Sequence, residues 1–365
     1  MPHHKKFKIA LIGYRLDKGG AERVMANLSI FFSKKGIEVY NVIVIDQIGY
    51  DFEGQLLNLG KLKNKTNGIF NKIVRLLVLK NYINKHNFDF IIDFRFRNKP
   101  LQELLIAKCI YNSKTIYTIH SHLIDHYISN FSLLARFTHS NAYALTTLTD
   151  VTKNLIYKKH HIDSTKMYNL IDIYEIQLKA QAPCNLLFEF IIGAGQMETN
   201  VKQFDVLIDC YVQSVLPKNN VHLVLMGEGR LSIELKKQAE KLNIADKVHF
   251  IGHQKNPFPF FKAAKYFVLS SANEGLPNVL LESLACNTPL ISFDCLSGPA
   301  EIVIPNTNGI LVENQNQVAL TNAMNLFFTD IYFYNKCKQN TFLKLHDFSI
   351  ETIGNQWLKL MKIEL

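Results

Sequence analysis

Long hydrophobic runs are missing from this chain of 365 residues. No apolar stretch reaches the roughly 18–20 residues that a helix needs to cross a bilayer. The basic start MPHHKKFKIALIG has too short an apolar part for a signal peptide, and it continues into what reads as a first strand. A membrane-spanning or secreted protein is therefore not expected.

Paired cysteines are missing too. The six cysteines are scattered without any C-x-x-C spacing, which predicts neither a disulfide framework nor a zinc site. We expect reduced thiols in a cytoplasmic protein. The run G-x-G-x-x-G is also absent, so a dinucleotide-binding fingerprint is not indicated.

Acidic residues are scarce in the first half of the chain. Residues 1–180 hold 26 Lys and Arg against 14 Asp and Glu, whereas the remainder holds 15 against 17. The basic half favours an anionic partner such as nucleic acid, a phosphate-bearing lipid or an acidic membrane. No RRM, KH or helix-turn-helix signature accompanies this charge, so nucleic acid is not the expected partner.

Buried-strand patterns alternate with helical patterns along the whole chain. The apolar run Ile9–Ile12 is typical of a parallel strand, and residues 21–36 have helical spacing that ends at Gly36. The alternation restarts near Asn185 and predicts an α/β protein with two doubly wound domains. We expect an N-terminal domain at 1–175, a second domain at 185–345 and a terminal helix at 346–365.

The stretch SSANEGLPNVLLESLACNTPLIS, residues 270–292, holds two glutamates that follow a buried strand. Glu274 is expected in the loop and Glu282 inside the following helix, with Pro277 in its first turn. Gly275 permits close approach of a ligand to the backbone, and free amides at a helix start suit a phosphate. Amides and carboxylates together suit a sugar nucleotide. The alternative is two solvated glutamates.

The segment E-G-L-P-N-V-L-L-E resembles the E-x7-E signature of glycosyltransferase family 4, retaining enzymes of GT-B architecture. The resemblance extends to the glycine-rich loop at 19–23, the turn at 226–229, the loop at 297–302 and the terminal helix SIETIGNQWLKLM. It implies two Rossmann-like domains facing across a cleft, with the C-terminal helix crossing back to the first domain.

The resemblance also implies roles for individual residues. Glu282 would hold the donor ribose, Glu274 the transferred sugar, and Lys202 the diphosphate. Gln196 stands where the family usually has arginine, so a cation is missing there, and Arg230 is a conceivable substitute. The predicted catalytic residues are Glu274, His120 and Lys202. The predicted donor-binding residues are Gly19, Gly20, Gln196, Lys202, Glu274, Gly275, Leu276, Pro277 and Glu282.

Metal and cofactor requirements follow from the same resemblance. No Asp-x-Asp occurs in the chain, which agrees with the metal-independent chemistry usual for this architecture, and no cofactor is expected. The histidines near His120 lack acidic or cysteine ligands that would complete a metal site. For His120 and for the Gly19–Gly20 turn, a purely structural role is the alternative.

The basic half offers candidates for the acceptor side. Residues 71–86 mix apolar and basic positions in a helical pattern, which suits an anionic lipid surface, unless the helix simply packs on a core. Arg95 and Arg97 follow an expected strand and are candidates to grip an acceptor phosphate.

Together these patterns predict a retaining glycosyltransferase. It would move a hexose or N-acetylhexosamine from a nucleotide sugar, UDP-linked by family habit, to a lipid-linked glycan in bacterial surface-polysaccharide or glycoconjugate synthesis. The enzyme would be cytoplasmic and peripheral on the inner membrane face. Two alternatives stay open: a nucleic-acid or anionic-lipid binding protein, and a GT-B epimerase or phosphorylase.

Overall fold

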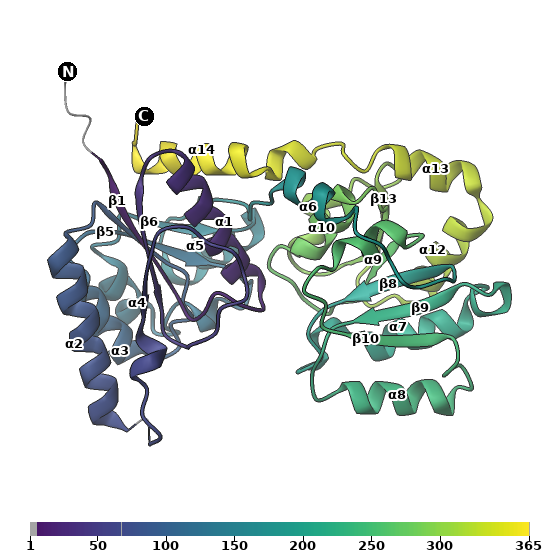
Figure 1. Ribbon diagram of the computed structural model, residues 1–365, viewed down its shortest axis with the longest axis horizontal. Coiled ribbons are helices and arrows are strands. Elements are labelled where there is room, and N and C mark those ends of the chain that lie inside the picture. The colour runs from purple at the N-terminus through teal and green to yellow at the C-terminus, as the bar shows by residue number, and fades with distance from the viewer. Residues whose placement is uncertain (1–5, 67, 365) are drawn as a thin grey trace. The chain divides into compact units, whose positions relative to one another are not determined.

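The computed structural model describes residues 6–66 and 68–364, which form two compact units (Figure 1). Unit 1 contains the described residues up to Leu170 together with those from Ile350 onward, and unit 2 is Ile171–Ser349. The chain therefore leaves unit 1 after Leu170 and returns to it at Ile350. The sequence analysis put the corresponding boundaries at 175, 185 and 346.

Unit 1 is built on a seven-stranded sheet in the order β3-β2-β1-β4-β5-β6-β7, and every neighbouring pair of strands is parallel. The strands are β1 (Lys8–Gly13), β2 (Glu38–Ile43), β3 (Gln55–Asn58), β4 (Phe90–Asp93), β5 (Lys114–Ile119), β6 (Ala144–Thr147) and β7 (Thr165–Lys166). β1 is buried almost throughout, which explains its continuous apolar run in the sequence.

Helices cover both faces of this sheet. They are α1 (Gly20–Lys34), α2 (Ile69–His86), α3 (Pro100–Leu105) with its continuation η2 (Ile106–Ile110), α4 (Ser132–His139), α5 (Asp150–His160) and α14 (Ile350–Met361). Alternate strand residues serve the two faces, as the period of two in a strand requires. Ile9 and Leu11 pack with α1 and α14, whereas Ala10 and Ile12 pack with α2, η2, α4 and α5.

The last helix of the chain completes the core of unit 1. Ile353, Trp357 and Met361 of α14 are buried in the same cluster as Phe31 of α1. Gly354 makes this packing possible, since a Cβ there would lie 2.5 Å from the Phe31 ring. Residues about 330 positions apart in the chain thus share one core, and the expected return of the terminal helix is what the structure has.

Unit 2 is built on a six-stranded parallel sheet in the order β10-β9-β8-β11-β12-β13. The strands are β8 (Phe190–Ala194), β9 (His222–Met226), β10 (Val248–Gly252), β11 (Phe267–Leu269), β12 (Leu290–Asp294) and β13 (Gly309–Glu313). The helices are α6 (Ile173–Lys179), α7 (Phe204–Gln213), α8 (Ser232–Lys241), α9 (Phe258–Ala263), α10 (Asn278–Ala285), α11 (Pro299–Ile302), α12 (Gln317–Thr329) and α13 (Ile331–Gln339). The predicted α/β class with two doubly wound sheets is confirmed.

Within residues 6–66 and 68–364, none of the helices is both long enough and apolar enough to pass through a bilayer.

Candidate functional site

Two of the predicted catalytic residues lie in unit 2, in loops that follow neighbouring strands. Lys202 ends the short helical turn η4 (Asn200–Lys202) that follows β8, and Glu274 lies in the loop between β11 and α10. Because β8 and β11 are adjacent in a parallel sheet, both loops leave the same edge. Ligands of such sheets bind outside the carboxyl ends of the strands. The topology therefore brings together residues that are 72 positions apart.

Lys202 and Glu274 meet in a charged hydrogen bond. The Lys202 Nζ donates to Glu274 Oε1 over 2.6 Å, and Ser271 Oγ donates to the same oxygen, also over 2.6 Å. The two charged side chains retain 21% and 11% of their exposure, respectively. This charged centre is held firmly and is still open to solvent. Ser271 was missed by the sequence analysis, although its S-x-x-E spacing to Glu274 is a signal that could have found it.

The backbone around this pair is tied together. Ala272 N–H donates to Val201 O, and Ser270 Oγ donates to Lys202 O, each over 2.8 Å. The aliphatic stem of Lys202 runs across Gly195, where a Cβ would lie 2.8 Å from the lysine Cε. A glycine at 195 thus makes room for the stem of Lys202.

The Gly275–Leu276–Pro277 segment is clamped by the loop that follows β12. Ser297 Oγ donates to Gly275 O over 3.2 Å. Gly298 has a φ of 98°, and a Cβ on it would lie 2.5 Å from Gly275 O. Only glycine adopts this conformation without strain at so close an approach. The predicted donor-binding segment therefore has its backbone set by a second loop, which spacing alone did not indicate.

Glu282 lies inside α10 and is only 5% exposed. It stands one turn before Cys286, whose thiol has its pKa raised to about 12, chiefly by burial and then by the Glu282 charge. A carboxylate placed this deep is a strong acceptor for hydroxyl groups that come within reach. Its assignment to a donor ribose stays a prediction.

Gln196 and Arg230 occur on two loops that are bonded to each other. Met197 N–H donates to Glu228 O, and Arg230 Nε donates to Glu198 O, each over 2.8 Å. Both Gln196 and Arg230 are exposed. The structure thus places a cation on the loop next to the position where the sequence lacks one.

The Gly19–Gly20 turn of unit 1 links β1 to α1. Gly19 has a φ of 155°, its N–H donates to Tyr50 Oη over 3.1 Å, and the Glu22 carboxylate lies where a Cβ on Gly19 would be. Burial raises the pKa of Glu22, and Arg15 at 3.7 Å opposes that effect. Glu22 occurs in the glycine-rich motif, yet the sequence analysis gave it no role.

His120 follows the end of β5. Both of its ring nitrogens are buried, and the ring stacks on Phe94 with 5.5 Å between centroids. Burial lowers the pKa of His120 to about 4, while the side chain of Asn169 acts in the opposite direction. The imidazole is therefore neutral near pH 7.

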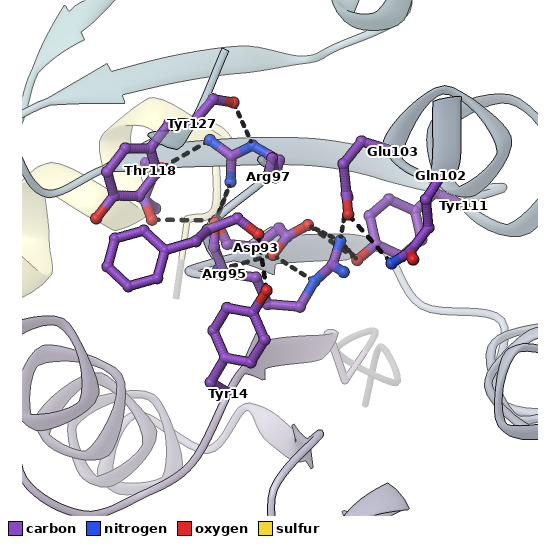
Figure 2. Close-up of polar contacts among 10 residues, drawn as sticks. Tyr14, Asp93, Arg95, Arg97, Gln102, Glu103, Tyr111, Thr118 and Tyr127 are labelled. Atoms are coloured by element: carbon purple, nitrogen blue, oxygen red, sulfur yellow. Dashed lines mark hydrogen bonds and ion pairs between the residues drawn. The ribbon is translucent and has the colours of Figure 1, made fainter. Parts of the chain in front are cut away.

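Arg95, a candidate contact for an acceptor phosphate, is buried and paired with carboxylates inside unit 1. Its guanidinium pairs with Asp93 over 2.7 Å and with Glu103 over 2.9 Å, and all three side chains are buried (Figure 2). Burial alone would raise the pKa of Asp93, but the charges of Arg95 and Arg97 bring it below its ordinary value. The arginine neutralises a buried carboxylate at the end of β4, so a grip on an acceptor phosphate would break this pair.

Arg97 is likewise used inside the domain. Its guanidinium donates to the backbone carbonyls of Asp93, Arg95, Thr118 and Tyr127 over 2.9–3.3 Å, and only 2% of the residue is exposed (Figure 2). These bonds join the segments that follow β4 and β5. The acceptor-phosphate role of Arg97 stays a prediction, and its burial was not foreseen, because the sequence shows the strand end but not the carbonyls that converge on it.

Across 6–66 and 68–364, no group of three or more His, Cys, Asp or Glu is arranged to hold a metal ion. Metal-independent action without a cofactor stays a prediction.

Comparisons with known proteins now give the family. Residues 179–344 match the model described as glycosyl transferases group 1. The chain is 30% identical over 339 residues, 88% of its length and 90% of the relative's, to the N-acetylgalactosamine-N,N'-diacetylbacillosaminyl-diphospho-undecaprenol 4-alpha-N-acetylgalactosaminyltransferase of Campylobacter jejuni. The chain belongs to the group 1 glycosyl transferases and is a glycosyltransferase.

Solved structures agree on the fold. A mutant of Staphylococcus aureus TarM in complex with Fondaparinux, alpha-GlcNAc-glycerol and UDP superposes with a TM-score of 0.79 at 15% identity, covering 97% of this chain and 99% of that one. Anabaena HepE in complex with UDP gives a TM-score of 0.75 at 17% identity, covering 98% and 100%. The predicted GT-B architecture is confirmed by these likenesses.

Proposed function

We propose that this enzyme moves a hexose or an N-acetylhexosamine from a UDP-sugar to a lipid-linked glycan, with retention of configuration, in bacterial surface-glycan or glycoconjugate synthesis. The relative in Campylobacter jejuni is named for a diphospho-undecaprenol acceptor. A second relative in that organism, 33% identical over 144 residues, is also named for a PP-undecaprenol acceptor. Two solved structures of the same fold are complexes with UDP. These names support a nucleotide sugar and a lipid-linked acceptor.

The bonded Lys202–Glu274 pair is the observation that carries the proposal. In the transfer, the bond from the sugar C1 to the diphosphate oxygen breaks, and a bond from the acceptor oxygen to C1 forms on the same face. The acceptor proton passes to an oxygen of the departing diphosphate. Negative charge grows on the leaving group, and a preorganised ammonium stabilises it. Lys202 would fill that role.

Glu274 would have two roles in the transfer. Its carboxylate fixes the Lys202 ammonium through Oε1, and it accepts hydrogen bonds from hydroxyls of the transferred sugar. Charge-assisted hydrogen bonds of this kind are stronger than neutral ones. Glu282, buried in α10, would accept the ribose hydroxyls. The backbone of Gly275 and Leu276, clamped by Ser297 and Gly298, would bind the sugar and the diphosphate.

Nucleotide binding can be tested by thermal unfolding with UDP, GDP, ADP and CMP, on wild type and on Glu282→Ala. A ligand at a hundred times its Kd stabilises the folded state by about 2.7 kcal/mol, which raises Tm by several degrees. We expect UDP alone to stabilise wild type and to have no effect on Glu282→Ala. Glu234→Ala, an exposed glutamate of α8, is the matched control. Equal stabilisation of Glu282→Ala would remove the ribose assignment.

Transfer itself is tested with UDP-sugars and a polyprenyl-diphosphate-linked glycan, and the product anomer is read by NMR. Retention predicts that donor and product share the same anomeric configuration. Incubation with the UDP-sugar but without acceptor separates the alternatives, because an epimerase would convert the sugar and a transferase would not. An inverted product would contradict the proposal.

A further inference from the structure

We propose that Ser271 is a positioning residue for sugar transfer. Its hydroxyl fixes the Glu274 carboxylate, and through it the Lys202 ammonium, in the orientation that the reaction uses. This inference rests on the proposed function, in which Glu274 contacts the transferred sugar and Lys202 the departing diphosphate. Ser271 itself contacts neither of these groups, and its effect on the reaction passes through the carboxylate.

Ser271 is buried where the chain leaves β11. It lies two positions after Leu269, the last residue of the strand, and it is 0% exposed. The Glu274 side chain retains 11% of its exposure, so the carboxylate is within reach of a ligand from solvent and the serine is not. Ser271 can therefore act on the transfer only through a group that it touches.

The direction of the hydrogen bond between the two side chains follows from their chemistry. A carboxylate that is ion-paired with a lysine has acceptor sites only, so the serine hydroxyl donates. Ser271 Oγ lies 2.6 Å from Glu274 Oε1, which is the length typical of an O–H bond to a charged oxygen. Such bonds are roughly twice as strong as neutral ones. The charged side chain is thus tied to the backbone of its own loop.

Two donors from different segments meet on this one oxygen. Lys202 Nζ, at the end of η4, also donates to Glu274 Oε1 over 2.6 Å. A lysine ammonium is a point charge on a flexible stem, and the terminal torsion of a glutamate is broad. The ion pair by itself therefore leaves the carboxylate free to turn. The bond from Ser271 restricts that rotation.

The neighbouring serine makes a different kind of contact. Ser270 Oγ donates to the backbone carbonyl of Lys202 over 2.8 Å, so it joins two loop backbones. Ser271 bonds the charged side chain itself. Of these two adjacent buried hydroxyls, it is Ser271 whose effect on transfer should depend on the presence of the Glu274 carboxylate.

The first test measures kcat and KM of Ser271→Ala with a UDP-sugar and a polyprenyl-diphosphate-linked glycan. We expect kcat to fall by about tenfold, and KM for the UDP-sugar to change by less than about twofold, because orientation matters most in the transition state. Ser214→Ala is the matched control and should transfer like wild type. It removes a buried hydroxyl at the end of α7 that donates to Tyr211 O. Thermal shift with UDP checks that both variants are folded.

Two further variants separate the hydroxyl from the space that it fills. Ser271→Thr keeps a hydroxyl donor and should recover most of the activity that Ser271→Ala loses. Ser271→Cys has nearly the volume of the serine but only a weak S–H donor, so it should be as slow as Ser271→Ala. Transfer by Ser271→Cys at the wild-type rate would overturn the proposal, because packing would then be what matters.

A double-mutant cycle shows whether the serine acts through the carboxylate. In a Glu274→Ala background the acceptor is gone, so adding Ser271→Ala should cause no further loss of kcat/KM. A further loss of about tenfold would overturn the inference, since the effect would then be independent of Glu274. Wild-type transfer by Glu274→Ala would contradict the proposed function itself. A slow Glu274→Ala beside a fully active Ser271→Ala would overturn the positioning role alone.

Discussion

The two units use buried and exposed charge differently at the same edge of similar sheets. In unit 1, Asp93, Arg95 and Glu103 form a closed, buried network. In unit 2, Lys202 and Glu274 form an equally short contact that solvent still reaches. An ion pair sealed inside a domain holds the backbone, whereas one left at the rim can exchange its partner for a ligand. Accessibility, more than residue type, separates the structural pair from the candidate catalytic pair.

The largest effect is expected for Arg95→Met in unit 1. Removing one partner of a buried ion pair costs about 3–5 kcal/mol, because the remaining carboxylates are left uncompensated. The measurement is denaturant unfolding, in which the transition of unit 1 should shift and UDP binding should persist. Lys99→Met, an exposed cation four residues away, is the control. Unchanged unfolding together with a raised acceptor KM would restore the acceptor role of this arginine.

Next comes Glu274→Gln in unit 2. The variant keeps the shape of the side chain but removes the charge that holds Lys202, so we expect kcat/KM for sugar transfer to fall by about 10²–10³-fold. Stability should change little, because the pair is partly exposed. Glu313→Gln, exposed at the end of β13, should transfer like wild type. A large loss of stability in Glu274→Gln would show that this pair resembles the one in unit 1.

Acid is expected to act on unit 1 through its buried histidines. Burial lowers the pKa of both His120 and His139 to about 4, in each case as the main cause. As the pH falls from about 6.5 to 4, the unfolded chain binds protons that the folded unit does not, so the unfolding free energy decreases. The loss at pH 5 is about 2 kcal/mol per histidine.

Thermal unfolding between pH 7 and 4.5 measures this acid effect. His139→Gln should show a flatter dependence on pH than wild type, whatever its stability at pH 7. A variant with the same slope as wild type would mean that His139 does not contribute to the acid response.

Gly195→Ala should have the smallest effect on stability, at most about 1 kcal/mol, because the atoms that its Cβ meets belong to the flexible stem of Lys202. Displacing that stem from Glu274 should still lower kcat/KM by about tenfold. Gly36→Ala is not a suitable control, since Gly36 has a φ of 79°. Gly68→Ala is better, because only Thr66 Oγ1 lies nearby, at 3.9 Å. Full activity in Gly195→Ala would argue against a fixed lysine.

The fold and part of the site could be predicted from the sequence for identifiable reasons. Parallel strands buried on both faces produce continuous apolar runs such as that at Ile9–Ile12, and helical spacing marked α1 and α7. The Glu274–Glu282 spacing and Lys202 were found because they belong to short motifs with a distinctive order. Local patterns of this kind can be recognised from the sequence alone.

Contacts between distant segments could not be predicted in this way. The carbonyls that accept hydrogen bonds from Arg97 belong to residues 93, 95, 118 and 127. The local sequence DFRFRNKP, residues 93–100, does not indicate that residues 118 and 127 lie beside it. Ser297 and Gly298 clamp the backbone of Gly275, which precedes them by more than 20 positions. For α2 the sequence left two alternatives open, a lipid-facing helix and a core-packing helix, because an apolar residue in a sequence gives no sign of whether it faces the core or solvent.

The return of α14 to unit 1 has a consequence for the order in which the protein is made. Trp357 and Met361 fill the core beside Phe31, so the half of the chain that is translated first cannot close its core until α14 has left the ribosome. Unit 2, Ile171–Ser349, is synthesised whole in the interval and can fold before unit 1 is finished. A chain cut before Ile350 should therefore release a folded unit 2 attached to an N-terminal half that proteases can attack.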